Sequence, residues 1–217
     1  MGHRVVCGCL LLLVWVVLPG RTGAQEVGDW HITVGGIHSQ PVGGLSKWFH
    51  GASNAELSVG QKCSQKWTIS GSLELARYER EALTGYAAGR VDLLLEHVAV
   101  LASGEVEIAE WGPVHPFLLL SGGLYRWKGV RGAIQADSTV SPYVPAIAAR
   151  TLQTTNWGLR VGAGVSVHVW RHLEGEASLC YRLVLGDLWP TMQPHIELEG
   201  VSGLQTINVS VGMRIWF

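Results

Sequence analysis

The chain has 217 residues, which is enough for one large domain or two small ones. Apolar residues make up 47% of it and charged residues only 15%, and this composition excludes a disordered chain. The formal net charge of −1 gives no basic footprint for nucleic acid, so we expect no nucleic-acid partner.

The N-terminal segment has the layout of an export signal. A short basic start is followed by an apolar run, Val5–Leu18, which Pro19-Gly20 ends, and Thr22-Gly23-Ala24 supplies the small residues of a cleavage site. The apolar run is shorter than the about 20 residues of a membrane-spanning helix, and a retained anchor helix is the alternative. We predict that residues 1–24 are a cleavable signal peptide and that residues 25–217 form the mature domain.

The rest of the chain alternates apolar and polar residues with a period of two, which predicts half-buried β-strands. In chain order the pattern predicts eight strands, at 29–38, 54–62, 67–78, 90–100, 115–128, 156–169, 176–185 and 207–217. In 90–100 the apolar face is assigned to Val91, Leu93, Leu95 and Ala99. In 115–128 the two faces are ambiguous, because Leu118 and Leu120 blur the alternation.

The gaps between these strands also alternate in length. Gaps 39–53, 79–89, 129–155 and 187–204 fall on one side, which we call the far side, and they are mostly long. Gaps 63–66, 101–114 and 170–175 fall on the near side, where the mature chain starts, and they are mostly short. Long loops on one side, short turns on the other and an even number of strands are typical of a transmembrane β-barrel. The 101–114 gap is longer than this pattern predicts.

Aromatic residues cluster near the predicted strand ends, where the rings of a membrane protein settle at the two membrane–water interfaces. We expect the following to form two interface belts: Trp30, Trp67, Trp170, Trp216 and Phe217 on the near side, and Trp48, Tyr78, Trp127 and Trp157 on the far side.

The charges on the polar faces are few and balanced in sign. A solvated outer face would carry more charge, so these side chains favour a barrel with lipid outside and charge inside. A soluble lipocalin-like barrel with a ligand inside is the alternative. The predicted ion pairs of the lumen involve five acids and five bases: Glu56, Glu74, Asp92, Glu96, Glu176, Arg90, Arg126, Arg160, Arg182 and Arg214.

The C-terminal sequence I-N-V-S-V-G-M-R-I-W-F resembles the terminal strand of bacterial outer-membrane proteins. In those proteins the final Phe and the alternating apolar positions are the barrel-assembly signal, and the matching residues here are Val209, Val211, Met213, Ile215 and Phe217. The segment from His115-Pro116-Phe117 to Gly122-Gly123 looks like the Pro-aromatic strand of small eight-stranded barrels, although its Gly-Gly departs from their Gly-x-Gly spacing and leaves the register open.

Over most of residues 25–217 the chain is similar to the outer-membrane protein A/X-like β-barrel family. The resemblance implies an all-β fold, an eight-stranded antiparallel up-and-down transmembrane β-barrel in the outer membrane of a Gram-negative bacterium. It implies the lipid bilayer, the barrel-assembly machinery and periplasmic chaperones as partners, and surface loops that could meet an unknown ligand. The resulting function is that of a porin-like structural scaffold that displays loops without catalysis.

Particular residues suggest two other functions. The stretch around His50, Ser53 and Glu56 loosely resembles the His-x-Ser-Asn motif of lipid A deacylases, in which His acts as base and Ser as nucleophile. Inward Arg160, Arg182 and Arg214 could select anions in a narrow channel, but pairing with Glu would make them a plug. We rate both below the scaffold.

Motifs for other chemistry are missing from the sequence. It contains no Gly-rich phosphate loop, no Cys/His metal spacing and no Gly-x-Ser-x-Gly elbow, so we expect no catalytic assignment, metal or cofactor. Removal of the signal peptide leaves Cys63 and Cys180, which are too few for a disulfide framework, although one bridge between them is conceivable.

Overall fold

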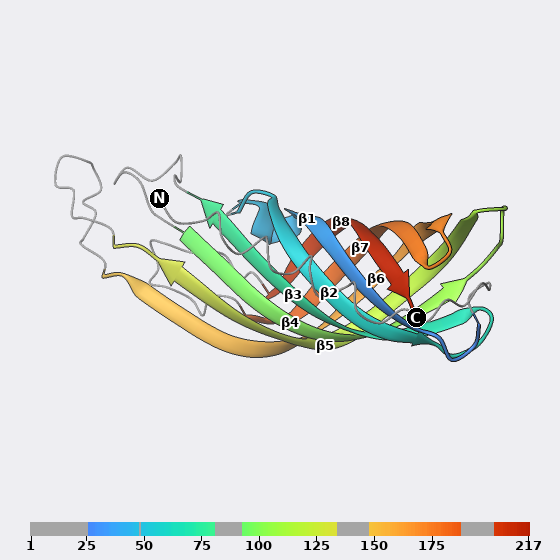
Figure 1. Cartoon of the computed structure of the whole chain (residues 1–217). Coiled ribbons are helices and arrows are strands. Elements are labelled where there is room, and N and C mark those ends of the chain that lie inside the picture. Colours follow the sequence, from blue (N-terminus) through green and yellow to red (C-terminus); the bar gives the residue numbers. More distant parts are fainter. Residues whose placement is uncertain (1–25, 48, 81–92, 134–147, 188–201) are drawn as a thin grey trace, which may run out of the picture.

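The computed structural model describes residues 26–47, 49–80, 93–133, 148–187 and 202–217. Their strands form one closed antiparallel barrel in which each strand pairs with its neighbours in the chain and β8 returns to β1. Figure 1 shows these strands inclined to the long axis of the barrel. The strands are β1 (Trp30–Pro41), β2 (Ala52–Lys62), β3 (Trp67–Arg80), β4 (Leu93–Glu107), β5 (Val114–Arg131), β6 (Arg150–Trp170), β7 (Leu173–Asp187) and β8 (Ser202–Trp216). The predicted signal peptide, 1–24, and Trp48, Arg90 and Asp92 lie outside the described residues.

The predicted all-β fold and the number of strands are confirmed, and most strands extend beyond the predicted limits. The chain forms these strands because its side chains alternate between two environments. Along β8, for example, Val209, Val211 and Met213 are exposed on the outside, while Asn208 and Arg214 are buried inside. The same alternation along β6 exposes seven outward residues in succession from Trp157 to Val169.

The near end of the barrel closes with short turns, at 63–66, 108–113 and 171–172. The 101–114 gap is mostly strand, because β4 continues to Glu107. Gly112 in the turn that follows has a φ of 63°, a left-handed conformation that favours glycine. Two of the three near-side turns are therefore shorter than the sequence predicted, and the turn 63–66 has the predicted length.

The face predicted for 90–100 is wrong. Leu95 and Ala99 are fully buried inside the barrel, and Val98 and Val100 are exposed on the outside. The ambiguous strand 115–128 is resolved in the same way, with Phe117 inside and its neighbour Leu118 outside. In these two strands apolar residues occupy both the odd-numbered and the even-numbered positions, which are the two parities and point to opposite faces of the sheet. Only closure of the barrel therefore decides which face points inward.

The first and the last strand of the sheet, β1 and β8, are joined at the near end of the barrel. The Trp30 amide donates to the Phe217 carbonyl at 3.0 Å, and the Phe217 amide donates to the Trp30 carbonyl at 2.9 Å. Closure leaves none of the described strands at a free sheet edge, which hydrocarbon would not tolerate. Within the described ranges, no helix is long and apolar enough to cross a membrane.

The far end of the barrel is uneven. The far-side ends of β1 and β2 are Pro41 and Ala52, and β5 and β6 form a longer wall that extends past them (Figure 1). Between β1 and β2 lies the short 3-10 helix η2 (Gly43–Lys47), which is held against β8 by a hydrogen bond from the Val42 amide to the Gln205 carbonyl at 2.9 Å. Leu45 of this helix is buried in the barrel.

Candidate functional site

Four charged side chains cross the middle of the barrel. Glu56 on β2 and Glu74 on β3 are direct cross-strand neighbours, and such like-charged pairs repel each other. Arg160 on β6 and Arg182 on β7 are likewise direct neighbours, on the opposite wall. Each carboxylate therefore needs a guanidinium from across the lumen, and we call these four residues the central crossbar.

The contacts of the central crossbar are specific. The Nη1 and Nη2 of Arg160 donate to the two carboxylate oxygens of Glu56 at 3.0 and 2.8 Å, a bidentate geometry that fixes the angle of both groups. The Nη2 of Arg182 donates to Glu74, whose other oxygen lies 3.2 Å from the Nε2 of His97. Arg182 also lies over the Tyr125 ring at 5.5 Å from its centroid. The two Arg–Glu contacts join residues that are more than one hundred positions apart in the chain.

Room for this layer comes from Gly158 on β6. A Cβ at that position would lie 2.5 Å from the ring of Tyr125, so a larger residue would displace the ring. The Tyr125 ring in turn meets His97 edge-on, with 5.6 Å between the ring centroids. The middle of the lumen is thus filled by side chains, as expected for a barrel of about eight strands.

A second group of charges crosses the lumen nearer the near end. The Nη2 of Arg214 on β8 donates to both carboxylate oxygens of Glu105 on β4, at 2.9 and 2.8 Å, and lies 2.8 Å from Oε2 of Glu176 on β7. We call Arg214, Glu105 and Glu176 the lower crossbar. Beside it, the indole Nε1 of Trp216 donates to Glu174 at 2.9 Å. One guanidinium thus holds two carboxylates from different strands.

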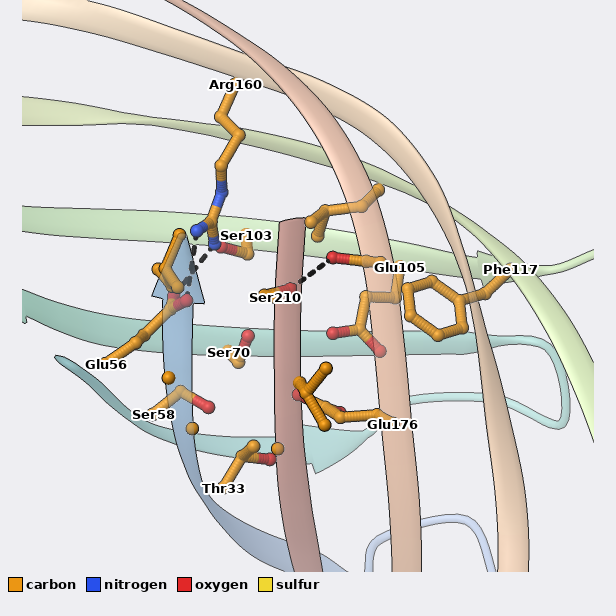
Figure 2. Close-up of a pocket in the computed structure, with 17 residues that line it drawn as sticks. Thr33, Glu56, Ser58, Ser70, Ser103, Glu105, Phe117, Arg160, Glu176 and Ser210 are labelled. Atoms are coloured by element: carbon orange, nitrogen blue, oxygen red, sulfur yellow. Dashed lines mark hydrogen bonds and ion pairs between the residues drawn. The ribbon is translucent and has the colours of Figure 1, made fainter. Parts of the chain in front are cut away.

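A small polar cavity of about 40 Å³ lies between the two crossbars. Figure 2 shows Arg160 and Glu56 at one end of it and Glu105 and Glu176 at the other. Pairs of serines bridge neighbouring strands in this region, Ser103 donating to Ser121 at 2.8 Å and Ser178 bonding Ser210 at 2.6 Å. The cavity has space for a few water molecules and not for an organic ligand.

The far end of the interior combines buried polar residues, such as Ser39 and Asn54, with a group of apolar side chains. Leu45 of η2 and Phe49 are each only 1% exposed, although they belong to a connection between two strands. Their burial follows from the inward fold of η2, which the Phe49 amide stabilises by donating to the Leu45 carbonyl at 3.0 Å. The other buried apolar side chains at this end are Tyr78, Leu95, Trp127, Val184 and Leu204.

The charged residues that the sequence predicted for the lumen fall into three groups. Six of them lie inside and are joined in the ion pairs of the two crossbars: Glu56, Glu74, Arg160, Glu176, Arg182 and Arg214. Arg90 and Asp92 lie outside the described residues. The inward position predicted for Glu96 and Arg126 is wrong, because both belong to the outward face: Glu96 pairs with the exposed Arg77 at 3.5 Å, and Arg126 is itself exposed.

The interface aromatics divide in a similar way. Trp30, Trp67, Trp157 and Phe217 are exposed on the outside of the barrel, and Trp170 is exposed at the near end of β6. The prediction is wrong for Tyr78, Trp127 and Trp216, which are buried inside. Each has a position of inward parity, and Trp127 and Trp216 use that position to donate their indole N–H to Asn156 and Glu174. The belt prediction considered distance from the strand end and neglected parity.

Three charged residues of the interior were missed by the sequence reasoning. Glu105, Glu107 and Glu174 were assigned to near-side turns, yet all three lie in strands and face inward. The alternation of Leu101, Ser103 and Glu105 with Ala102 and Gly104 carries the signal for the first. It was overlooked because the face of β4 was assigned to the opposite parity.

The residues of the possible deacylase motif do not converge. Ser53 is exposed and Glu56 has the opposite parity, so that its carboxylate is held inside by Arg160. Cys63 and Cys180 are free, and the bridge between them is absent. Within the part of the chain that the structure describes, no group of three or more His, Cys, Asp or Glu side chains is arranged to hold a metal ion.

No protein-family model and no characterised relative matches the chain by sequence. Solved structures do match it in shape. Neisserial surface protein A is 16% identical, with a TM-score of 0.55 over 87% of this chain and 97% of its own. A major outer-membrane protein of Thermus thermophilus is 10% identical, with a TM-score of 0.54 over 88% of this chain and 100% of its own. Ail, the attachment invasion locus protein of Yersinia pestis, is 15% identical, with a TM-score of 0.50 over 88% and 100%. The chain therefore has the fold of the outer-membrane β-barrels.

Proposed function

We propose that this chain is an integral outer-membrane protein in which the barrel is a closed scaffold that carries its far-side connections at the cell surface. The outward face supports insertion in a bilayer, since it is a continuous belt of exposed aliphatic side chains such as Val211, which is 64% exposed. A soluble protein does not leave an apolar surface of this size in water. In lipid the same surface is favourable, and the two crossbars occupy the interior.

The observation that carries the scaffold proposal is the central crossbar. Its bidentate Arg160–Glu56 contact and the buried Arg182–Glu74 pair span the lumen from wall to wall. Ions would have to break these charge-assisted contacts in order to pass. The apolar residues of the far end, Leu45 and Phe49, add a second obstruction. These features favour a scaffold over a channel.

The lipocalin-like alternative is disfavoured by the same interior. A drug-sized ligand needs a pocket of about 300 Å³ or more with mainly apolar walls. The cavity between the crossbars measures about 40 Å³, and serines and charged residues line it together with a few apolar side chains such as Phe117 and Leu119. Its walls are mainly polar and its size fits water.

Bilayer conductance tests the proposal. The chain from residue 25 onward, refolded into a planar bilayer, is expected to give no steady single-channel current, and its boiled and unboiled forms are expected to migrate differently on a gel. A matched variant with Arg160→Ser and Glu56→Ser removes one rung of the crossbar and is expected to conduct more than the unaltered chain. A steady current through the unaltered barrel would refute the closed scaffold.

We further propose that the terminal residues of β8 are read by the barrel-assembly machinery during insertion. Val209, Val211, Met213, Ile215 and Phe217 all stand at outward parity on the last strand. Deletion of Phe217 is expected to reduce the amount of barrel in the membrane fraction of cells while leaving refolding in detergent unchanged. Equal loss in both assays would indicate a purely structural role.

The segment between β5 and β6 is the longest far-side connection and the best candidate for contact with a surface partner. A short epitope inserted between residues 134 and 147 is expected to be labelled by antibody on intact cells. Labelling only after the cells are broken would contradict the proposed orientation.

A further inference from the structure

In the strands that the structure describes, lysine and arginine occur on the outward face of the barrel at one place only. Among the outward-facing side chains of the described strands, Arg77 on β3 and Arg126 and Lys128 on β5 are the only Lys or Arg residues. All three lie toward the far end of their strands. The described outward faces of β6, β7, β8, β1 and β2 have none. The positive charge is therefore confined to one sector and one end.

Arg126 and Lys128 lie at the far-side edge of the apolar belt on the outside of the barrel. Below them on β5, Leu118, Leu120 and Leu124 are exposed, and Leu124 pairs with Trp157 of β6, which is 66% exposed. At a rise of about 3.4 Å per residue and a tilt of about 40°, the outward residues from Val114 to Leu124 span about 25 Å, the height of a bilayer-facing belt. The two bases thus stand at the level of the lipid headgroups, directly beyond the indole of Trp157.

The charge of Arg126 is held in place without being neutralised. When the Gln153 amide is turned so that its oxygen faces Arg126, that oxygen lies 2.8 Å from Nε and 2.9 Å from Nη2. Gln153 is also the cross-strand neighbour of Lys128. Glu96 is the neighbour of Lys128 on β4, but its carboxylate pairs with Arg77, and among the described residues neither Arg126 nor Lys128 has a carboxylate within ion-pair distance. Arg77 differs, because its guanidinium is paired with both Glu79 and Glu96.

From this arrangement we propose that Arg126 and Lys128 bind the phosphate of a glycolipid headgroup in the leaflet at the far end. The inference rests on the proposed insertion in an outer membrane. Two adjacent cations matched to one phosphate supply the charge, and Gln153 fixes the orientation of the guanidinium. Trp157 and Leu124 supply a flat apolar surface for the sugar and acyl groups directly beneath. Arg77, being neutralised, takes no part.

Lipid selectivity in vesicles tests this site. The mature chain is refolded into phosphatidylcholine vesicles, and energy transfer from its tryptophans to a dansyl-labelled lipid A reports the relative affinity for the phosphorylated glycolipid. The unaltered barrel is expected to prefer lipid A over phosphatidylcholine, and rising salt is expected to weaken the preference. Arg126→Gln with Lys128→Gln is expected to lower the affinity about thirtyfold, because each basic residue near an anionic surface contributes about fivefold.

Three controls separate the alternatives. Arg77→Gln with Glu96→Gln removes an ion pair from the same sector without freeing the Glu96 carboxylate, and it is expected to change the affinity less than twofold. Arg126→Lys with Lys128→Arg keeps the charge and is expected to retain the preference. Inorganic phosphate is expected not to displace the lipid. An unaltered affinity in the Arg126→Gln, Lys128→Gln variant, an equal loss in the Arg77→Gln, Glu96→Gln variant, or displacement by inorganic phosphate would overturn the proposal.

The gel shift on boiling is recorded for every vesicle preparation. Barrels that insert and shift but show no lipid preference refute the phosphate site alone. A chain that does not insert refutes the proposed membrane function on which the site depends.

Discussion

The inside and the outside of this barrel are built from the same alternating strands, yet they obey different rules. Inside, the arginines of the two crossbars have specific partners on distant strands, as Arg182 has Glu74 and Arg214 has Glu105. Outside, most positions share only the property of being apolar. The interior therefore depends on particular pairs, while the outer wall depends on a general property that many residues satisfy. Single substitutions should cost more inside than outside.

The largest effect is expected from breaking the central crossbar. Arg182→Met leaves the carboxylate of Glu74, which is fully buried, with a weaker set of partners. Loss of one member of a buried pair typically lowers the free energy of unfolding by about 3–5 kcal/mol. Urea unfolding in detergent micelles measures the change. The double variant Arg182→Met, Glu74→Met removes both charges and should recover much of the stability. If it unfolds as readily as the single variant, the pair does not carry the effect.

A charge in the middle of the outer wall is expected to come next. Val211→Arg places a guanidinium against the acyl chains near the middle of the belt, which costs about 2–4 kcal/mol in membrane barrels. Thr155→Arg puts the same side chain at the far edge, beside Arg126, and should cost about 0–1 kcal/mol. Unfolding in vesicles compares the two. Equal costs would contradict the placement of the membrane at this belt.

An intermediate effect is expected at the near end, where Trp216 is buried and Trp170 is exposed. Trp216→Phe removes the hydrogen bond that the indole donates to Glu174 at 2.9 Å. Hydrogen bonds to charged groups contribute about 1.5–3 kcal/mol. Trp170→Phe, at an exposed position, should change the unfolding free energy by less than about 0.5 kcal/mol. A reversed order would mean that Trp216 serves the interface after all.

The smallest expected difference sharpens the comparison between adjacent residues. Leu119 is buried in a cluster with Phe117 and Cys180, whereas Leu118 is exposed on the outside. Leu119→Val removes one methylene from a packed position and should cost about 1 kcal/mol, and Leu118→Val should cost less. Unfolding midpoints in one detergent suffice to rank the two. Equal values would place both side chains in similar surroundings.

The fold was predictable from the sequence because lipid requires apolar side chains on the outward face of every strand. Alternation over β6 and β8 fixes both the strands and their faces, since nearly every outward residue is apolar. β4 shows where the rule fails. Its run of Leu93–Leu95 and Val98–Leu101 is apolar at both parities, so neither face could be chosen from the sequence alone.

The interior was predictable only in part. Arg160, Arg182 and Arg214 follow from parity within clear strands, but their partners do not, because pairing across the lumen depends on the tilt and register of the closed barrel. Glu105 was lost for this reason together with the misassigned face of β4. Tyr78 and Trp216 show a different error, since parity already placed them with the polar residues and the expectation of an aromatic belt overrode it.

The most direct test of the whole structure is solvent accessibility along β8. Single cysteines at positions 207–213, in a chain with Cys63→Ser and Cys180→Ser, are spin-labelled in vesicles, and their collisions with membrane-soluble oxygen and a water-soluble nickel chelate are compared. We expect oxygen accessibility to rise at 207, 209, 211 and 213 and to fall at 208, 210 and 212. High nickel accessibility at the odd positions, or no alternation, would contradict a barrel whose aliphatic face meets lipid.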